Sequence, residues 1–135
     1  MISKLGDEFM PRRMTRHSAG YDLYAPFEVN IAAGGTLMFD TGIALEDGDI
    51  QDNQFLMVLP RSSMGFKYGL RMSNTCPIID SDYRETIKVS ITVDRDCHLH
   101  RGERFAQMIV MTYGTIAGEI QPTDVRKSGI GSTGA

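Results

Sequence analysis

Two carboxylates and a tyrosine stand close together in the segment "PIIDSDYRET". Asp80 follows the apolar Ile78 and Ile79, and Tyr83 comes three positions later. A carboxylate held against apolar neighbours can act as a general base toward water, and a flat tyrosine ring can form the wall of a sugar or base pocket. The alternative is an Asx turn between two strands, in which Asp80 or Asp82 bonds its own backbone.

An arginine and two serines in "PRSSMGFKYGL" form a second group. We expect one helical turn here, with Ser62 or Ser63 as its cap, directly after Arg61. Free N–H groups at a helix start and a neighbouring arginine both favour an anion. The same residues could equally form only a capped turn between strands.

The C-terminal segment "RKSGIGSTGA" is rich in glycine, serine and threonine and has no periodic pattern. We therefore divide the chain into a folded domain, 1–125, and a flexible arm, 126–135. Glycine backbone N–H groups, the hydroxyls of Ser132 and Thr133 and the charge of Arg126 could also cradle a phosphate. The spacing is not that of a P-loop.

The composition limits the classes of partner. Fourteen basic and 17 acidic residues give a net charge of -3, so no overall positive field attracts a nucleic acid or an anionic membrane. The two cysteines form no CxxC pair, and the three histidines (His17, His98 and His100) lack ligand spacing, so we expect no metal ligands. Without an apolar run of signal or membrane length, we expect a cytoplasmic protein, in a host's cytoplasm if a virus encodes it.

The sequence predicts that short β-strands position the polar segments described above. Ile87, Val89, Ile91 and Val93 alternate with polar residues in "TIKVSITVD", which predicts a strand over 86–94 with one buried face. Further strands are predicted over 21–31, 36–45, 54–59 and 104–113. No helical period is sustained, so the sequence favours an all-β sandwich or jelly roll.

Five segments, taken in chain order, resemble the five motifs of the trimeric dUTPase family. They are "AGYDLYA", "PRSSMGFKYGL", "IIDSDYRETIKV", "GERFAQMIV" and "GIGSTG", and they run from residue 19 nearly to the end. One such segment could arise by chance, whereas five in the family's order are specific. The resemblance implies a homotrimer of jelly-roll-like β-barrel subunits. It also implies three active sites, each assembled from all three chains, that hydrolyse dUTP to dUMP and pyrophosphate.

The resemblance also implies roles for single residues. Asp80 would activate the water that attacks the α-phosphorus, and Tyr83 would leave no room for a 2′-hydroxyl beside the deoxyribose. Asp22 would support the phosphate site. Magnesium would be held by the substrate phosphates and water, without protein ligands. The implied substrate-binding residues are Arg61, Ser62, Ser63 and Gln107 at the phosphates, Asn74, Ile78, Ile79 and Lys88 at the nucleoside, and Arg126, Gly131, Ser132 and Thr133 over the γ-phosphate.

The chain departs from the family pattern at three positions. Pro77 and Glu85 stand where glycine is usual, and Ile130 stands where phenylalanine is usual. Pro77 fixes φ and removes a donor from the uracil hairpin. Glu85 predicts a turn that does not need positive φ. Ile130 cannot stack on the uracil ring as an aromatic side chain would.

Two other functions are compatible with parts of the sequence. A dCTP deaminase shares the fold and an "RSS" motif, but the "IDSDY" turn and the absence of glutamate between residues 86 and 94 disfavour it. A non-catalytic nucleotide-sensing or protein-binding module on the same fold would also fit the three departures. A regulatory protein partner is left open.

Overall fold

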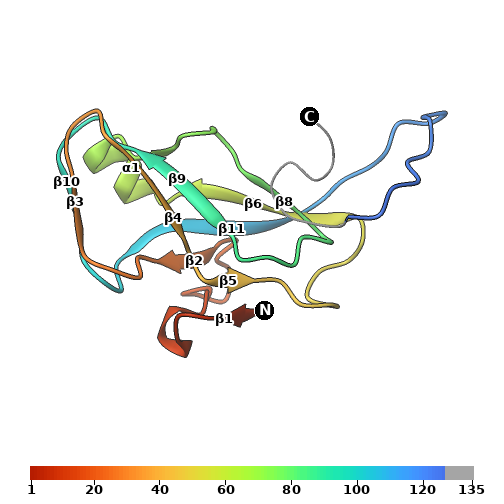
Figure 1. Ribbon diagram of the computed structural model, residues 1–135, viewed down its shortest axis with the longest axis horizontal. Helices are drawn as coiled ribbons and strands as arrows, with labels where there is room; N and C mark the ends of the chain where they lie inside the picture. Colours follow the sequence, from red (N-terminus) through yellow and green to blue (C-terminus); the bar gives the residue numbers. More distant parts are fainter. Residues whose placement is uncertain (127–135) are drawn as a thin grey trace.

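The computed structural model describes residues 1–126, in which short antiparallel strands build an all-β body (Figure 1). Its two longest strands, β6 (Gln54–Pro60) and β11 (Arg104–Thr112), pair along their length. β2 (Tyr21–Tyr24) extends this sheet beyond β11, and β8 (Ile78–Asp80) extends it beyond β6. The strand order is therefore β2-β11-β6-β8.

A second, three-stranded sheet has the order β4-β9-β7. It consists of β4 (Thr36–Asp40), β9 (Lys88–Thr92) and β7 (Arg71–Met72). Val58 of the first sheet and Ile91 of the second are both fully buried and belong to one apolar cluster. Burial of each such aliphatic side chain contributes about 1.5–3 kcal/mol.

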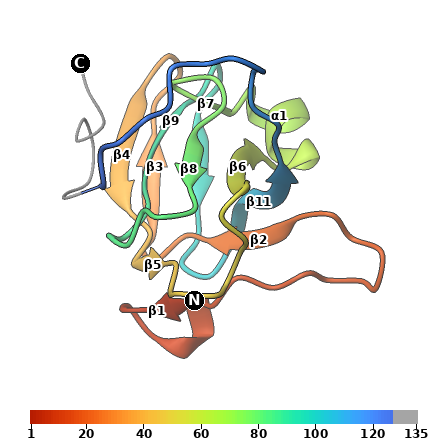
Figure 2. The same cartoon turned by 90° about the vertical axis from the view of Figure 1, so that its right-hand side faces the viewer.

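Two small strand pairs complete the body. β1 (Ile2–Ser3) pairs with β5 (Ile43–Ala44), and the 3-10 helix η1 (Asp7–Phe9) follows β1. β3 (Val29–Ile31) pairs with β10 (Cys97–Leu99) at the left end of the body in Figure 1, the same end as α1. The chain between η1 and β2 projects from the body (Figure 2).

The alternating pattern is confirmed, because Ile87, Val89, Ile91 and Val93 are all buried. The strands expected over 54–59 and 104–113 are confirmed as β6 and β11, each within one residue at its end.

Two expected strands are each divided in the structure. The segment 21–31 forms β2 and β3, which pair with different strands, because Pro26 between them has no N–H to continue a ladder. The segment 36–45 forms β4 and β5, which are separated at Gly42. Gly42 has φ 72°, and a Cβ atom there would lie 2.5 Å from Leu5 Cγ, so the strand must break at a glycine.

The expected helical turn is a seven-residue helix, α1 (Ser62–Tyr68), and it closes at Gly69 with φ 64°. The expected serine cap is wrong. Arg61 is the N-cap residue, in extended conformation and without a side-chain cap bond, so Ser62 and Ser63 lie inside the first turn. Their side chains remain exposed.

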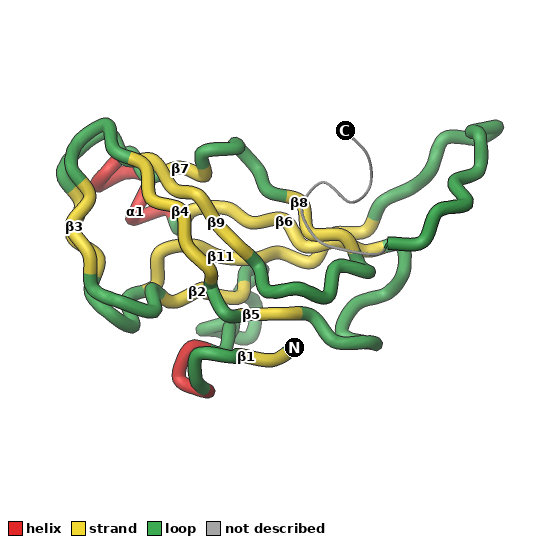
Figure 3. Tube along the Cα trace, in the orientation of Figure 1, coloured by secondary structure: helices red, strands yellow, loops and turns green. Residues whose placement is uncertain are grey.

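The segment around Asp80 begins as a strand, because Ile78–Asp80 form β8. The turn comes after it, and the Tyr83 N–H donates to the backbone oxygen of Asp80 at 3.1 Å. Beyond β11 the chain forms a long loop that projects from the body and turns back toward it (Figure 3). No helix within residues 1–126 has the length and apolar character needed to cross a membrane.

Candidate active site

A polar cavity of about 460 Å³ lies between the start of α1 and the β2–β11 pair. It brings together Asp22 and the four residues that the sequence assigned to the phosphates outside the C-terminal arm. We call it the anion cavity, and it is lined by Met14, Ser18, Ala19, Gly20, Asp22, Arg61, Ser62, Ser63, Arg104 and Gln107.

One carboxylate in this cavity faces two guanidinium groups. Asp22 is 7% exposed, and its Oδ1 lies 3.6 Å from Arg61 Nε. The Arg104 Nη1 donates to Asp22 Oδ2 at 3.1 Å. Two positive charges against one negative charge leave the cavity with an excess of positive charge, which suits a phosphate ligand.

Sequence reasoning missed Arg104, and a β-bulge explains why. The register of β11 against β2 shifts between Arg104 and Ala106. Regular alternation would direct Arg104 to the same face as the buried Ala106. The extra residue, Phe105, is fully buried, so Arg104 instead shares the face of Gln107 and Asp22.

Gln107 is held in place by its neighbours. Its Nε2 donates to the backbone oxygen of Pro60 at 3.2 Å. A Cβ atom at Gly20 would lie 2.1 Å from Gln107 Oε1, so any larger residue at position 20 would displace the Gln107 side chain. In the sequence, the only signal for this contact is the glycine within "AGYDLYA", which marks a position where another segment can approach closely. Within residues 1–126 the Ser62 and Ser63 hydroxyls make no hydrogen bond, which leaves them available to a ligand.

A second cavity, of about 350 Å³, brings Asn74 and Lys88 together. It is lined by Met38, Ser73, Asn74, Lys88, Val89 and Ser90. The hairpin beside it is tight, because the Cys76 N–H donates to the Asn74 oxygen at 2.8 Å across Thr75, which has φ 69°. Such a φ is unusual for a β-branched residue and marks a strained turn.

Asp80 and Tyr83 lie together and meet Arg126. The Arg126 Nη2 donates to Asp80 Oδ2 at 2.5 Å, and its Nε donates to Asp82 Oδ1 at 2.8 Å. The guanidinium carbon lies 5.6 Å from the centre of the Tyr83 ring. The hydrogen bond to Asp82 and the charges of both carboxylates raise the pKa of Arg126. Asp82 was not assigned a role from the sequence.

The Tyr83 side chain is buried and hydrogen-bonded, whereas the Asp80 side chain is exposed to solvent. The Tyr83 side chain is 8% exposed, and its hydroxyl donates to the Thr86 backbone oxygen at 3.1 Å. Asp80 is exposed at the end of β8, beside the half-buried Ile79 and the exposed Ile78. The Asp80 carboxylate therefore forms a salt bridge with Arg126, in place of the hydrogen bond to its own backbone that an Asx turn would have.

The departures at Pro77 and Glu85 have local explanations. Pro77 precedes the first residue of β8, where a missing N–H costs no ladder bond, and its oxygen accepts the Val58 N–H at 3.0 Å. Among the non-glycine residues of 1–126, positive φ occurs at Thr75, not at Glu85. The prediction that Glu85 does not need positive φ is confirmed. Ile130, Gly131, Ser132 and Thr133 lie outside the described residues.

The two halves of the expected site lie apart in one chain. Asp80 pairs with Phe55 at one end of β6, while Arg61 follows Pro60 at the other end. Five residues of strand separate these ends, which is roughly 17 Å at about 3.3 Å per residue. One chain by itself does not bring the Asp80 carboxylate to the anion cavity.

The fold is all-β, and its cationic cavity and the separate polar cavity beside a tight hairpin together suit a phosphorylated ligand. The chain belongs to the dUTPase family, whose family model matches residues 8–134.

Relatives and solved structures agree with this assignment. The chain is 38% identical over 140 residues to the deoxyuridine 5′-triphosphate nucleotidohydrolase of Escherichia phage T5, covering 93% of this chain and 92% of that protein. It is 36% identical over 133 residues to the same enzyme of Rickettsia massiliae, covering 93% and 88%. The crystal structure of the dUTPase from Streptococcus mutans superposes with a TM-score of 0.72 at 30% identity, covering 84% of this chain and 92% of that one.

Proposed function

We propose that this chain is a dUTP diphosphatase, which hydrolyses dUTP to dUMP and pyrophosphate. The observation that carries the proposal is the anion cavity, where two arginines, two free serine hydroxyls and Gln107 converge, in a chain that matches the dUTPase family over nearly its whole length. A dCTP deaminase or a non-catalytic module is not favoured.

The triphosphate occupies the anion cavity. Arg61 and the Ser62 and Ser63 hydroxyls donate to its oxygens, and Asp22 keeps both arginines in place without cancelling their charge. The pyrophosphate leaving group gains negative charge as the bond to the α-phosphorus breaks, and fixed cationic donors stabilise that charge. Gln107, held by Pro60, contributes a further donor or acceptor.

The nucleoside occupies the second cavity. Asn74 and the backbone around Ile78 and Ile79 bind the uracil edge, and Lys88 lies at the margin. Tyr83 packs against the deoxyribose, and its buried ring is rigid enough to exclude a 2′-hydroxyl. Asp80 accepts the proton of the water that attacks the α-phosphorus in line with the leaving group.

Magnesium dependence is general in the dUTPase family. The anion cavity fits magnesium only as a complex with phosphate, because its one carboxylate, Asp22, already faces two arginines. Magnesium would be held by the substrate phosphates and water rather than by side chains of this cavity, and would supply neutralisation of the triphosphate charge.

The active enzyme is a homotrimer, in which Asp80 of one chain faces the anion cavity of another. The distance along β6 supports this arrangement, because both halves of the site face solvent yet do not meet in one chain. The arm, 126–135, follows the folded domain, 1–125, and closes over the γ-phosphate with Arg126, Gly131, Ser132 and Thr133. The two cysteines, Cys76 and Cys97, are free, as a reducing cytoplasm of a cell or host permits.

The test is pyrophosphate release from dUTP, dCTP, dTTP and UTP, with and without magnesium, and ammonia release measured in parallel. The proposal expects rapid pyrophosphate release from dUTP only, dependence on magnesium and no ammonia. Ammonia from dCTP would favour the deaminase, and tight binding of a non-hydrolysable dUTP analogue without turnover would favour the non-catalytic module.

A further inference from the structure

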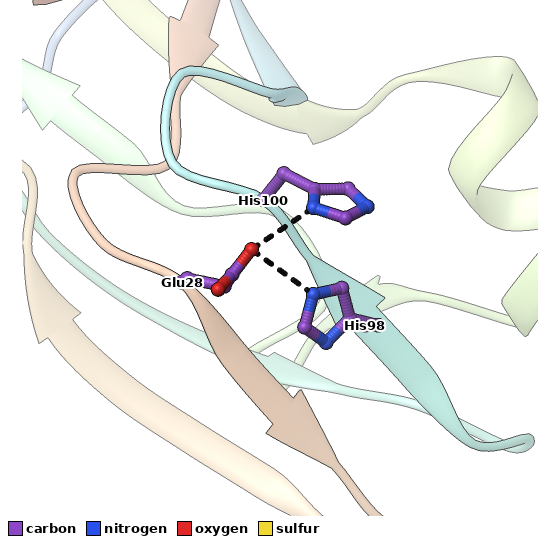
Figure 4. A group of neighbouring side chains, drawn as sticks. All are labelled: Glu28, His98 and His100. Atoms are coloured by element: carbon purple, nitrogen blue, oxygen red, sulfur yellow. Dashed lines mark hydrogen bonds and ion pairs between the residues drawn. The ribbon is translucent and has the colours of Figure 1, made fainter.

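Two histidines and a glutamate lie together at the β3–β10 pair (Figure 4), and none of them lines either cavity. In the antiparallel register Asn30 lies opposite His98 and Val29 opposite Leu99. Glu28 and His100, the next residues outward, continue on the same face as Asn30 and His98 because side chains alternate. Three potential metal ligands therefore gather at one end of the molecule.

The distances fit one shared cation. Glu28 Oε1 lies 3.3 Å from His98 Nε2 and 3.0 Å from His100 Nδ1. All three ligand atoms lie within 4.8 Å of one another. Two ligands held at about 2.0–2.1 Å from a tetrahedral ion are roughly 3.3 Å apart. The side chains thus need only small rotations to bind a single ion.

Asn30 contacts one ring nitrogen of His98 and leaves the other to a ligand. Its Oδ1 lies 2.5 Å from His98 Nδ1, which suits a ring that keeps its proton on Nδ1 when Nε2 ligates an ion. The other ring nitrogen, Nε2, lies 3.3 Å from Glu28 Oε1. A hydrogen bond to the nitrogen that does not ligate the ion is the usual support of a metal-binding histidine.

The surrounding charges do not oppose a cation. Glu103 Oε2 accepts the His100 backbone N–H at 3.2 Å and adds a negative charge beside the group. Arg101, the adjacent cation, is held by Glu8 at 3.1 Å and lies over the Phe9 ring.

We propose that Glu28, His98 and His100 bind a divalent transition-metal ion, of which Zn²⁺ is the commonest with two imidazoles and one carboxylate. This donor set disfavours Mg²⁺ and Ca²⁺, which take oxygen ligands. The ion links the β3 segment to the β10 segment at the protein surface, and water fills its remaining coordination positions. The site stands independently of the proposed dUTP hydrolysis, because none of its ligands lines either cavity.

Calorimetric titration with Zn²⁺, in excess Mg²⁺ and after removal of bound metal by a chelator, tests the site. We expect one Zn²⁺ per chain and a higher melting temperature. Glu28→Gln, His98→Gln and His100→Gln should each weaken binding about 100-fold or more, and Asn30→Ala about 10- to 100-fold. His17→Gln and Cys76→Ser are matched controls that should bind like the parent chain.

A second measurement does not depend on the variants folding. In the parent chain, Zn²⁺ should shift the side-chain ¹⁵N resonances of His98 Nε2 and His100 Nδ1 and leave those of His17 in place. Absent binding, binding that His17→Gln or Cys76→Ser abolishes, or binding that survives all three ligand variants would each overturn the proposal. Unchanged affinity in Asn30→Ala would overturn the role of Asn30.

Discussion

The Asp80 carboxylate lies 2.5 Å from the guanidinium of Arg126, the last described residue of the chain. The exposed carboxylate proposed to accept a proton from water is therefore paired with a cation in this structure. In the proposed mechanism Arg126 leaves Asp80 for a phosphate oxygen, which frees the carboxylate to act as a base. The neighbouring Asp82, which pairs with the same arginine at 2.8 Å, offers a matched control.

The first prediction compares these two acids. Asp80→Asn preserves shape and removes the base, so kcat should fall by about 10²-fold or more while a non-hydrolysable dUTP analogue still binds. Asp82→Asn loses the same kind of ion pair with Arg126 and should keep most of its turnover. Steady-state kinetics and calorimetry measure both. Equal losses in the two variants would mean that the ion pair, rather than a base, accounts for the effect.

The second prediction concerns the Tyr83 ring. Tyr83→Ala should weaken discrimination between dUTP and UTP, because the wall that excludes the 2′-hydroxyl is removed. Tyr83→Phe keeps the wall and loses only the hydrogen bond to Thr86, so it should keep the discrimination and lose about 1 kcal/mol of stability. The readout is the ratio of kcat/KM for the two nucleotides. A ratio unchanged in Tyr83→Ala would remove Tyr83 from this role.

The strands could be predicted from the sequence more fully than their breaks. Alternation specified β9 because one buried face imposes period 2 on Ile87 through Val93. The divisions at Pro26 and Gly42, and the two- and three-residue strands β7, β8 and β10, were missed. Such short segments have too few residues to show a period, and their pairing depends on partners far along the chain.

For the site, sequence motifs identified residue types but not their neighbours. The motif containing Gln107 was recognised, yet Arg104 was not assigned, because a β-bulge that reverses the facing of a side chain leaves no compositional signal. In the same way, the sequence spacing of His98 and His100 does not indicate metal ligands. The third potential ligand, Glu28, lies beside them only because β3 pairs with β10.

The third prediction concerns Asp22. Asp22→Asn removes the one carboxylate between Arg61 and Arg104 and leaves two guanidinium groups facing each other. Because both arginines are partly exposed, the cost should be about 1–2 kcal/mol of unfolding free energy, with a raised KM for dUTP. The matched control, Asp94→Asn, breaks the exposed pair with Arg71 and should cost less than about 1 kcal/mol. Urea unfolding compares them, and equal costs would contradict the supporting role.

The fourth prediction concerns the arm. Deleting residues 126–135 should leave a folded protein, because the buried core residues within 1–126 all lie at or before Met108. Turnover should collapse, since Arg126 and the hydroxyl and backbone donors proposed for the γ-phosphate are lost. Ile130→Phe should lower KM for dUTP several-fold if stacking on the base adds about 1–3 kcal/mol. Circular dichroism and kinetics measure the outcome, and full activity in the deletion variant would contradict the arm's role.

The last prediction tests whether two chains share one site. Asp80→Asn and Arg61→Ala chains should each be nearly inactive alone. In a trimer with cyclic symmetry, every trimer that contains both kinds of chain has one complete site. That site has a normal Asp80 from one chain and a normal Arg61 from its neighbour.

Unfolding the two variants together in equal amounts and refolding them should therefore restore activity to about one quarter of the parent value. Three quarters of randomly assembled trimers are mixed, and each has one complete site in three, so about one quarter of all sites are complete. A chain carrying both substitutions, refolded with itself, is the control and should stay inactive. If each site were built within one chain, no mixture could restore activity. An inactive mixture whose trimers are shown by native mass spectrometry to contain both chains would contradict the shared site.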